Sequence, residues 1–209
     1  DQAVVIIAPR PTFSETFLYM CLVACDAAQI APLIMLNKKD LPEFEAARKS
    51  IAHLEEIGYE VLPMSAKFDI EPLRPLLKGK RTLLVGQSGM GKSTLVNALI
   101  PEANAATREI SQALDSGKHT TTFTRLFTLG GNDTWVIDSP GMQVFGLAHF
   151  SRNEIERAFP EFRDSIGQCR FRDCRHETEP DCRVQAALRH GEIDHRRYAA
   201  FRSLCAEIV

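Results

Sequence analysis

The chain has 209 residues, 44% of them hydrophobic and 25% charged, and its formal net charge is −2. These values are ordinary for a globular protein and leave room for one large domain or for a domain with a smaller module. They exclude an argument for nucleic-acid binding from overall charge, and the sequence shows neither an apolar run of membrane-spanning length nor a signal peptide. We therefore expect a cytoplasmic protein with no membrane partner, and nothing in the sequence calls for more than a monomer.

Strands and helices alternate through the first half of the chain. The apolar run at 3–8 predicts a core strand, and because it begins almost at once, we expect an upstream part of the protein to be missing. The further expected elements are a helix at 14–30, a strand at 32–36, a helix ending near 57, a strand at 61–64, a short helix around 70–77, a strand at 82–85 and a helix from 93. This alternation is typical of an α/β fold with a mostly parallel sheet and helices on both of its faces.

The strand at 32–36 ends in Asn37-Lys38-Lys39-Asp40, which matches the N-K-x-D pattern of guanine-binding loops. The Asp40 carboxylate can accept hydrogen bonds from the ring N–H and the exocyclic amine of guanine, a donor pair that adenine lacks. Asn37 can bond the other edge of the base, and the stem of Lys38 can pack across it. A polar loop after a strand would explain this short motif equally well if it stood alone.

A second motif, Ser65-Ala66-Lys67, follows the strand at 61–64 and matches the companion S-A-K loop. There the backbone N–H of Ala66 would meet the guanine carbonyl oxygen. Because both motifs come directly after strands of the same predicted sheet, they together predict a guanine site.

The next strand leads into Gly86-Gln87-Ser88-Gly89-Met90-Gly91-Lys92-Ser93, which fits the phosphate-loop pattern G-x-x-x-x-G-K-[ST]. Glycines let successive N–H groups curl around phosphate oxygens, and the N-terminus of the following helix adds partial positive charge. Lys92 would reach the β and γ phosphates, and the Ser93 hydroxyl would ligate Mg²⁺. A chance glycine-rich turn is the alternative, but a strand before and a helix after favour a nucleoside triphosphate site.

Downstream, residues 101–119 show no periodicity and are expected to form a mobile loop. Alternation from Phe123 to Leu129 and the run at 134–138 predict two strands joined by a hairpin. The second strand ends in Asp138-Ser139-Pro140-Gly141, which fits D-x-x-G. Asp138 would hold Mg²⁺ through water, and the Gly141 N–H would contact the γ-phosphate. A threonine of the 120–122 run would complete the Mg²⁺ shell, unless these threonines only favour a strand.

Three cysteines and a histidine crowd together near the C-terminus in the spacing Cys169-x4-Cys174-x-His176-x5-Cys182. Three thiolates and one imidazole suffice for a closed tetrahedral zinc, which indicates one structural Zn²⁺ rather than a catalytic ion. Free thiols or a disulfide are the alternative. Because residues 160–182 carry few large apolar side chains, a metal would help this small module to keep its shape.

Residues 151–209 contain eleven arginines, no lysine and eleven acidic residues, which by count indicates a balanced, solvated surface. However, Arg170, Arg172 and Arg175 lie inside the cysteine–histidine segment, and Arg196 and Arg197 lie on a helix expected at about 191–206. Arginine suits phosphate oxygens and unpaired bases, so contact with RNA is a hypothesis.

The order of the motifs is unusual, because the guanine-binding loops precede the phosphate loop and D-x-x-G. In this order, and in the added zinc spacing, the chain resembles the RsgA (YjeQ) family of circularly permuted GTPases that act on the small ribosomal subunit. The resemblance covers nearly all of residues 3–209. It implies GTP hydrolysis to GDP and phosphate, stimulated by the small subunit late in its assembly, and a zinc domain that contacts rRNA and responds to the GTP state. The rival interpretation is an rRNA-binding factor whose GTP site is a latch with negligible turnover.

The resemblance also implies roles for individual residues. Thr121 is similar to the Mg²⁺-binding switch threonine, with Thr120 as the alternative one position away. His119 matches a histidine that helps to position the attacking water, although contact with rRNA is an equal possibility for it. Met142 stands where a water-orienting glutamine is found in Ras-like proteins, so we expect slow intrinsic hydrolysis.

By the same resemblance, an OB-fold would precede residue 1, a permuted GTPase domain would occupy 1–148, and a mainly helical zinc domain 149–209. The predicted catalytic residues are Lys92, His119 and Thr121, and the predicted Mg²⁺ ligands are Ser93, Thr121 and Asp138. The predicted nucleotide-binding residues are Asn37, Lys38, Asp40, Ser65, Ala66, Lys67, Gly86, Gln87, Ser88, Gly89, Met90, Gly91, Lys92, Ser93, Thr94, Asp138 and Gly141.

Overall fold

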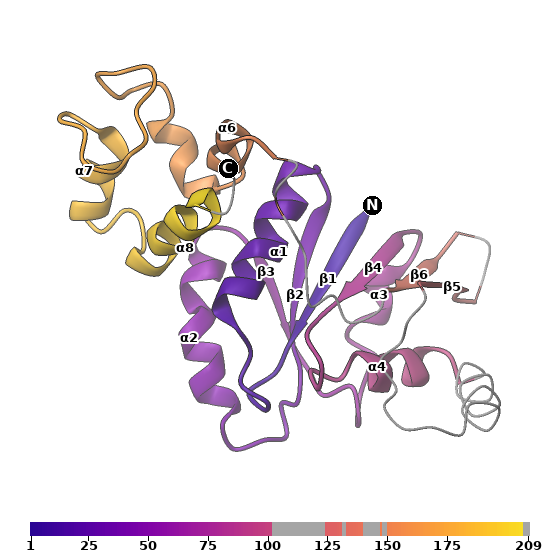
Figure 1. The fold of residues 1–209 in the computed structure, drawn as a ribbon. Helices are drawn as coiled ribbons and strands as arrows, with labels where there is room; N and C mark the ends of the chain where they lie inside the picture. The colour runs from indigo at the N-terminus through magenta and orange to yellow at the C-terminus, as the bar shows by residue number, and fades with distance from the viewer. Residues whose placement is uncertain (102–123, 131–132, 140–146, 148–149, 207–209) are drawn as a thin grey trace, which may run out of the picture. The chain divides into compact units, whose positions relative to one another are not determined.

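The computed structural model describes residues 1–101, 124–130, 133–139, 147 and 150–206 (Figure 1). By their contacts the residues fall into two compact units. Unit 1 comprises Asp1–Ser14 and Ile30–Val144, and unit 2 comprises Glu15–Gln29 and Phe145–Val209. The expected domain boundary at 148 stays a prediction, and the mobile loop expected at 101–119 lies, from residue 102 on, outside the described residues.

Unit 1 is built on a six-stranded sheet in the order β3-β2-β1-β4-β6-β5. Every strand pair is parallel except β5 with β6, which confirms the predicted mostly parallel sheet. All six residues of β1 are buried, as expected for a central strand of a parallel sheet. The strands are β1 (Gln2–Ile7), β2 (Ala31–Leu36), β3 (Glu60–Pro63), β4 (Arg81–Val85), β5 (Arg125–Thr128) and β6 (Trp135–Asp138).

The strand order places a topological switch point between β1 and β4. The chain runs outward from β1 through β2 to β3, and then returns to the other side of β1 as β4. Val5 of β1 pairs with Ile34 of β2 and with Val85 of β4, so these three strands end at nearly the same level. In open parallel sheets, ligands bind beyond the carboxyl ends of the strands at such a point.

The helices of unit 1 are α2 (Phe44–Glu56), α3 (Arg74–Leu77) and α4 (Lys92–Leu99). Gly58 follows α2 with a positive φ of 100°, as the predicted C-terminal cap requires. Helix α3 is shorter than the predicted 70–77. The Asp69 carboxylate accepts a hydrogen bond from the Glu71 N–H (2.9 Å), a local turn that competes with helix formation at this point.

Unit 2 contains helix α1 (Glu15–Ala27), α6 (Arg152–Arg157), the 3-10 helix η1 (Pro160–Ser165), α7 (Arg183–Arg189) and α8 (His195–Ala206). The rings of Phe159, Phe162 and Phe201 pack at centroid distances of 4.9–5.5 Å in its core, and Val23 and Ala24 of α1 belong to the same core. Helix α8 begins at His195 rather than near 191, because Gly191 takes a positive φ of 74° after α7.

One arginine of α8 is part of this core. Arg197 is 0% exposed, its Nε lies 2.6 Å from Glu161 Oε1, and its guanidinium stacks 4.4 Å from the Phe159 ring centroid. Arg196 pairs with Asp194 at 3.1 Å. Arg197 therefore serves the fold and is withdrawn from the RNA-facing group in which the sequence pattern placed it.

Candidate functional site

The two predicted guanine loops and the phosphate loop meet at one buried side chain. Asn37, which follows β2 and is 2% exposed, donates from Nδ2 to the Met90 carbonyl (2.8 Å). Its Oδ1 accepts the Ala66 N–H at 2.9 Å. A single amide thus connects three loops that are up to 53 residues apart in the sequence.

These bonds change how two predicted guanine contacts must be understood. The Ala66 N–H, expected to meet the guanine carbonyl, is used by Asn37, and Asn37 itself has one hydrogen bond on each side of its amide. One N–H of Asn37 remains in principle for a base, because an amide nitrogen carries two hydrogens. Both guanine contacts stay predictions, while the positioning role of Asn37 is a feature of the fold.

Asp40 is exposed and ready to accept donors from a ligand. The Ser65 hydroxyl donates to its Oδ1 at 2.5 Å, and this hydrogen bond is the main cause that holds the pKa of Asp40 below its ordinary value. Lys67 and Lys38 lower it further by charge. The carboxylate is therefore ionised and oriented before any base arrives, as bidentate recognition of guanine requires.

Lys38 fastens the guanine loop to the phosphate loop. Its ammonium donates to the Gly89 carbonyl at 2.7 Å and to the Arg10 carbonyl at 2.5 Å. Lys38 takes a positive φ of 63°, a conformation that a non-glycine residue adopts only at some cost.

The phosphate loop tolerates glycine alone at two of its positions. A Cβ on Gly91, whose φ is +100°, would lie 2.2 Å from Asn37 Nδ2, and a Cβ on Gly86 would lie 2.8 Å from the Ile6 carbonyl oxygen. The loop runs directly into α4, whose first turn carries Ser93 and Thr94 on its exposed side. Backbone N–H groups and a helix N-terminus are thus combined as in an anion-binding nest.

Lys92 and Asp138 come together although 46 residues separate them in sequence. They are 9% and 7% exposed, and the Lys92 Nζ lies 3.1 Å from Asp138 Oδ1. Lys92 also donates to the Ser139 carbonyl. The predicted phosphate-binding cation and the predicted Mg²⁺-binding carboxylate therefore share one buried place between the ends of β4 and β6.

The remaining predicted residues of the hydrolytic site lie outside the described residues. These are His119, Thr120, Thr121 and Gly141, together with Met142.

The segment between β1 and α1 is a support for the phosphate loop that the sequence analysis missed. The Gln87 Oε1 accepts the Ser14 N–H at 3.0 Å, and a Cβ on Gly89 would lie 2.9 Å from the ring of Pro11. The proline-rich stretch directly after β1, at the same edge of the sheet as the other loops, is the signal that could have identified it.

The cysteine–histidine segment forms a compact cluster in unit 2. One ligand atom each from Cys169, Cys174, His176 and Cys182 lies within 4.8 Å of the others. Cys169 Sγ is 3.9 Å from Cys182 Sγ and 3.6 Å from His176 Nδ1, which is 3.3 Å from Cys182 Sγ. A tetrahedral zinc, with bonds of about 2.3 Å to sulfur and about 2.0 Å to nitrogen, places its ligand atoms about 3.5–3.8 Å apart, so the donors fit this metal.

The three thiols of the cluster differ in acidity. Burial raises the pKa of Cys169, but the Arg183 N–H and the neighbouring thiols and imidazole outweigh it, so the pKa lies below its ordinary value. Burial is the main cause that raises the pKa of Cys174 to about 12. Because a metal must displace these protons, its binding is expected to weaken as the pH falls.

A carboxylate holds the turn of this cluster. Glu179 accepts the N–H groups of Arg175 (2.7 Å), Glu177 (2.8 Å) and Thr178 (3.1 Å), and these bonds, that of Arg175 first, lower its pKa to about 2.

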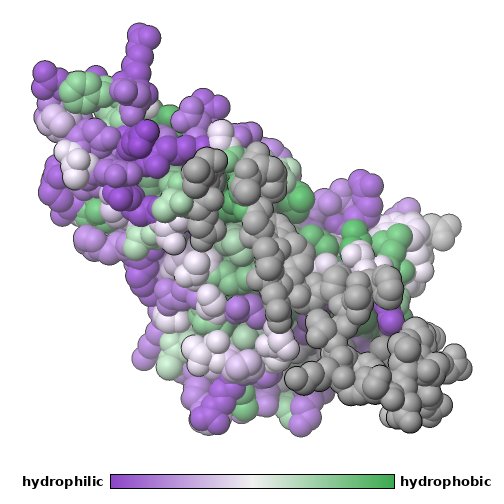
Figure 2. All heavy atoms as spheres, viewed as in Figure 1, coloured by the Kyte–Doolittle hydropathy of each residue, from purple (hydrophilic) through white to green (hydrophobic). Residues whose placement is uncertain are grey.

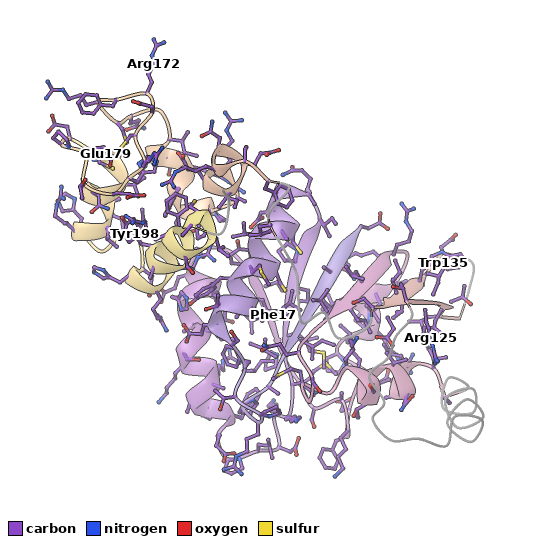
Figure 3. The ribbon with its side chains drawn as sticks, in the orientation of Figure 1. Phe17, Arg125, Trp135, Arg172, Glu179 and Tyr198 are labelled. Carbon is purple, nitrogen blue, oxygen red and sulfur yellow. The ribbon has the colours of Figure 1, made fainter. Side chains whose placement is uncertain are left out.

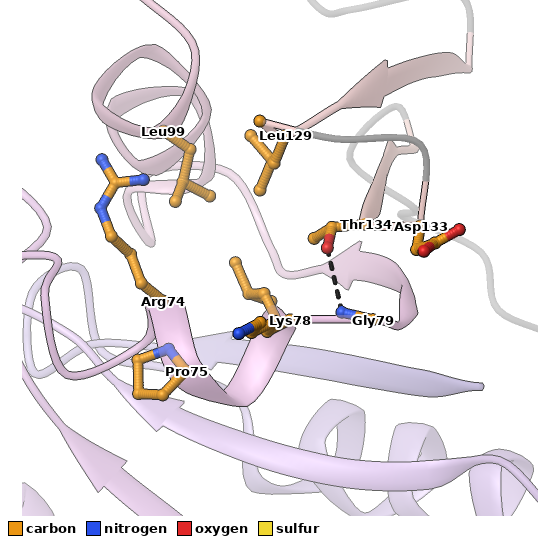
Figure 4. A pocket seen from close by; sticks show the side chains of 10 residues that line it. Arg74, Pro75, Lys78, Gly79, Leu99, Leu129, Asp133 and Thr134 are labelled. Carbon is orange, nitrogen blue, oxygen red and sulfur yellow. Dashed lines mark hydrogen bonds between the residues drawn. The ribbon is translucent and has the colours of Figure 1, made fainter.

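A pocket of about 560 Å³ lies at the opposite edge of the sheet from the nucleotide loops (Figure 4). Its lining includes Leu77, Leu99, Leu129 and Thr134, whose hydroxyl accepts the Gly79 N–H at 2.9 Å. No predicted site residue lines it. Among the described residues, no helix is both long and apolar enough to cross a membrane.

Comparison with known proteins gives one consistent result. A family profile described as RsgA GTPase matches residues 1–148. The small ribosomal subunit biogenesis GTPase RsgA of Nitrosomonas europaea is 49% identical over 207 residues, which cover 97% of this chain and 66% of that protein. The protein of the same name from Paraburkholderia phytofirmans is 49% identical over 216 residues, covering 99% and 68%. The chain thus spans about two thirds of the length of these curated relatives.

Two solved structures share the fold. YjeQ from Thermotoga maritima matches with a TM-score of 0.79 at 31% identity, covering 100% of this chain and 71% of its own. YloQ, described as a circularly permuted GTPase, matches with a TM-score of 0.76 at 29% identity, covering 100% and 68%. These matches and the mostly parallel sheet confirm the predicted fold, that of a circularly permuted GTPase.

Proposed function

The chain belongs to the RsgA GTPase family, and from this premise we propose that it hydrolyses GTP to GDP and phosphate in the maturation of the small ribosomal subunit. The observation that carries the proposal is the bridge made by Asn37 between the N-K-x-D, S-A-K and phosphate loops. It brings the residue types that select guanine and those that bind phosphate to one edge of one sheet.

Recognition of guanine is assigned chiefly to Asp40. Its carboxylate accepts the ring N–H and the exocyclic amine, while Ser65 holds it in place and keeps it ionised. ATP offers no such donor pair, so binding is specific for guanine nucleotides.

Hydrolysis is assigned to the place shared by Lys92 and Asp138. When GTP binds, the ammonium of Lys92 moves to the β and γ phosphate oxygens, and Asp138 becomes free for the water shell of Mg²⁺. With Ser93 and Thr121 as further ligands, Mg²⁺ would neutralise charge that develops on the phosphates. His119 orients the attacking water, with in-line attack on the γ-phosphate, and the Gly141 N–H contacts that phosphate.

The cysteine–histidine cluster is assigned one structural Zn²⁺. All four donors are used by a closed tetrahedral site, so no position is left for a substrate. Zinc supplies the cross-link that a short, loop-rich segment needs to keep one conformation.

Unit 2 is assigned a contact with rRNA through the tip of its metal-binding loop. Arg172 points into solvent (Figure 3), and Phe171 is 42% exposed with the Arg170 guanidinium 5.5 Å from its ring centroid. The surface around this loop is mostly hydrophilic (Figure 2). An exposed aromatic ring between two arginines suits an unpaired base flanked by phosphates.

The charge-reversing double variant Arg170→Glu and Arg172→Glu tests this contact. We expect weaker binding to small subunits and a smaller salt dependence, by about one log unit of slope per lost phosphate contact. Arg189→Glu, an exposed arginine of α7, is the matched control. Equal binding and slope in all three proteins, with zinc content unchanged, would refute the contact.

The GTP state is proposed to reach unit 2 along the chain. The segment after D-x-x-G leads into unit 2, so a change at the γ-phosphate is passed on covalently. Similar positions of the zinc-binding segment on the subunit with GDP and with a GTP analogue would count against it.

The deciding experiment measures GTP turnover of the protein in its full natural form, alone and with purified small ribosomal subunits. Many-fold stimulation is expected, since Met142 cannot orient water and intrinsic hydrolysis should be slow. Tight GDP and GTP binding without stimulated turnover would favour the latch interpretation instead. The cytoplasm and a monomeric state are part of the proposal, because subunit assembly takes place there and no feature requires a second copy.

A further inference from the structure

The imidazole of His176 has two different environments on its two sides. Nδ1 faces the thiols, 3.3 Å from Cys182 Sγ and 3.6 Å from Cys169 Sγ. Nε2 faces the other way, 3.1 Å from Oε1 of Glu156 on α6. Both side chains are buried, at 4% and 12% exposure, so water competes little for this contact.

A neutral imidazole that gives one nitrogen to a metal must carry its proton on the other. We propose that Glu156 is a positioning residue of the metal site, which accepts the Nε2–H of His176 and thereby selects Nδ1 as the metal-binding nitrogen. The inference rests on the assignment of a metal to the cysteine–histidine cluster. A carboxylate behind a ligating histidine fixes the ring and makes it a better donor.

The backbone of His176 is held as firmly as its ring. Its carbonyl accepts the Tyr198 hydroxyl at 2.6 Å and the Gln185 Nε2 at 2.6 Å. Its φ is +61°, so the residue sits in a conformation that requires support from its surroundings. Helices α6, α7 and α8 therefore each supply one contact to this single ligand, through Glu156, Gln185 and Tyr198 respectively.

This arrangement gives Glu156 a role that its own helix does not need. The N-terminus of α6 is closed by the capping box of Ser151 and Glu154, with the Ser151 N–H donating to the Glu154 carboxylate at 2.7 Å. Glu156 is free of that task and points to the cluster, where an isolated buried carboxylate would be costly without a donor. The imidazole N–H is that donor in the metal-bound state.

The first test compares zinc affinity, measured by competition with a chromophoric chelator, in the wild-type protein and three variants. Glu156→Ala is expected to bind zinc about 10- to 100-fold more weakly. Glu156→Gln keeps an acceptor oxygen but no charge and should fall between the two. Asn153→Ala, an exposed change on the same helix, should bind as the wild type does.

The second test reads the proton directly by ¹⁵N NMR of histidine-labelled, zinc-loaded protein. We expect His176 to bind through Nδ1 and to carry a slowly exchanging Nε2–H, whose exchange becomes faster in Glu156→Ala. A purely structural glutamate would leave this exchange unchanged in a folded variant.

The outcomes are separable. A wild-type protein that binds no zinc would overturn both the metal assignment and this inference, whereas zinc binding equal within twofold in wild type and Glu156→Ala would overturn the inference alone. Binding through Nε2 would do the same. Should Glu156→Ala fail to fold, unchanged Nε2–H exchange in Glu156→Gln decides against it.

Discussion

At Asn37 one side chain serves both recognition and folding. Its amide satisfies a buried N–H and a buried carbonyl on two other loops, so the three loops hold each other in place before a nucleotide binds. The N-K-x-D motif had been interpreted as a direct reader of guanine. The structure adds that its first residue preorganises the site, which lowers the ordering cost of binding.

Asn37→Ala is predicted to lose at least tenfold in GDP affinity and about 1–3 kcal/mol of unfolding free energy, because the Ala66 N–H and the Met90 carbonyl are left buried without their partner. Titration with a fluorescent GDP analogue and denaturant unfolding measure both. Lys39→Ala, an exposed change in the same loop, should alter neither. An equal affinity in Asn37→Ala and Lys39→Ala would contradict the bridging role.

Ser65→Ala is predicted to raise the pKa of Asp40 toward its ordinary value, because it removes the main cause of the depression. Since guanine needs the carboxylate, binding is present above the pKa and lost as the pH falls through it. The variant should therefore lose GDP affinity at a higher pH than the wild type. The pKa of Asp40 from NMR titration and GDP binding down to acidic pH measure this, and superimposable curves would refute it.

At the scale of elements, the phosphate loop is supported from three sides. The guanine loop holds it through Asn37 and Lys38, and the segment after β1 holds it through Pro11 and Ser14. The loop has little freedom to relax around a new atom. A close packing of this kind explains why glycine is needed at Gly91.

Gly91→Ala is predicted to abolish measurable nucleotide binding, because a Cβ there would lie 2.2 Å from Asn37 Nδ2. Gly58→Ala is the matched control, since Gly58 has the same φ of +100° but nothing within 4 Å. Both variants should lose about 1–2 kcal/mol of stability from the left-handed backbone. Isothermal titration with GDP separates them, and retained binding in Gly91→Ala would show that the loop can move.

At the scale of the whole molecule, helix α1 has a neighbourhood that its place in the chain does not reveal. It lies between β1 and β2 in sequence, yet its contacts assign it to unit 2, where Val23 and Ala24 join the core of the C-terminal segment. The chain therefore enters unit 2 twice, once at Glu15 and once at Phe145. Any loosening of unit 2 is expected to reach α1.

Removal of zinc by a chelator is predicted to speed amide hydrogen exchange in 150–206 and in α1 together, while β1 and β4 keep their protection. The reason is that α1 shares its core with the metal-dependent unit. Hydrogen exchange followed by mass spectrometry, with and without chelator, measures this. Exchange of α1 at the rate of β1 after zinc loss would contradict the assignment.

Local patterns in the sequence were sufficient for the fold class, the guanine and phosphate loops and the metal-binding cluster. Each of these depends on residue types at fixed spacing directly after a strand or within a short loop, and parallel strands bring their carboxyl ends to one edge of a sheet. The short α3 and the late start of α8 were not predicted, because a side-chain turn at Asp69 and the backbone of Gly191 act against the apolar pattern.

The tertiary structure alone decided which side chains hold these loops. The bridge of Asn37, the pair of Lys92 with Asp138, the burial of Arg197 and the approach of Glu156 to His176 join residues that are 20 to 53 positions apart. No local pattern encodes such contacts, because they depend on how whole strands and helices pack. The sequence determined the chemistry available to this protein, and the packing determined which of its residues carry that chemistry and which support it.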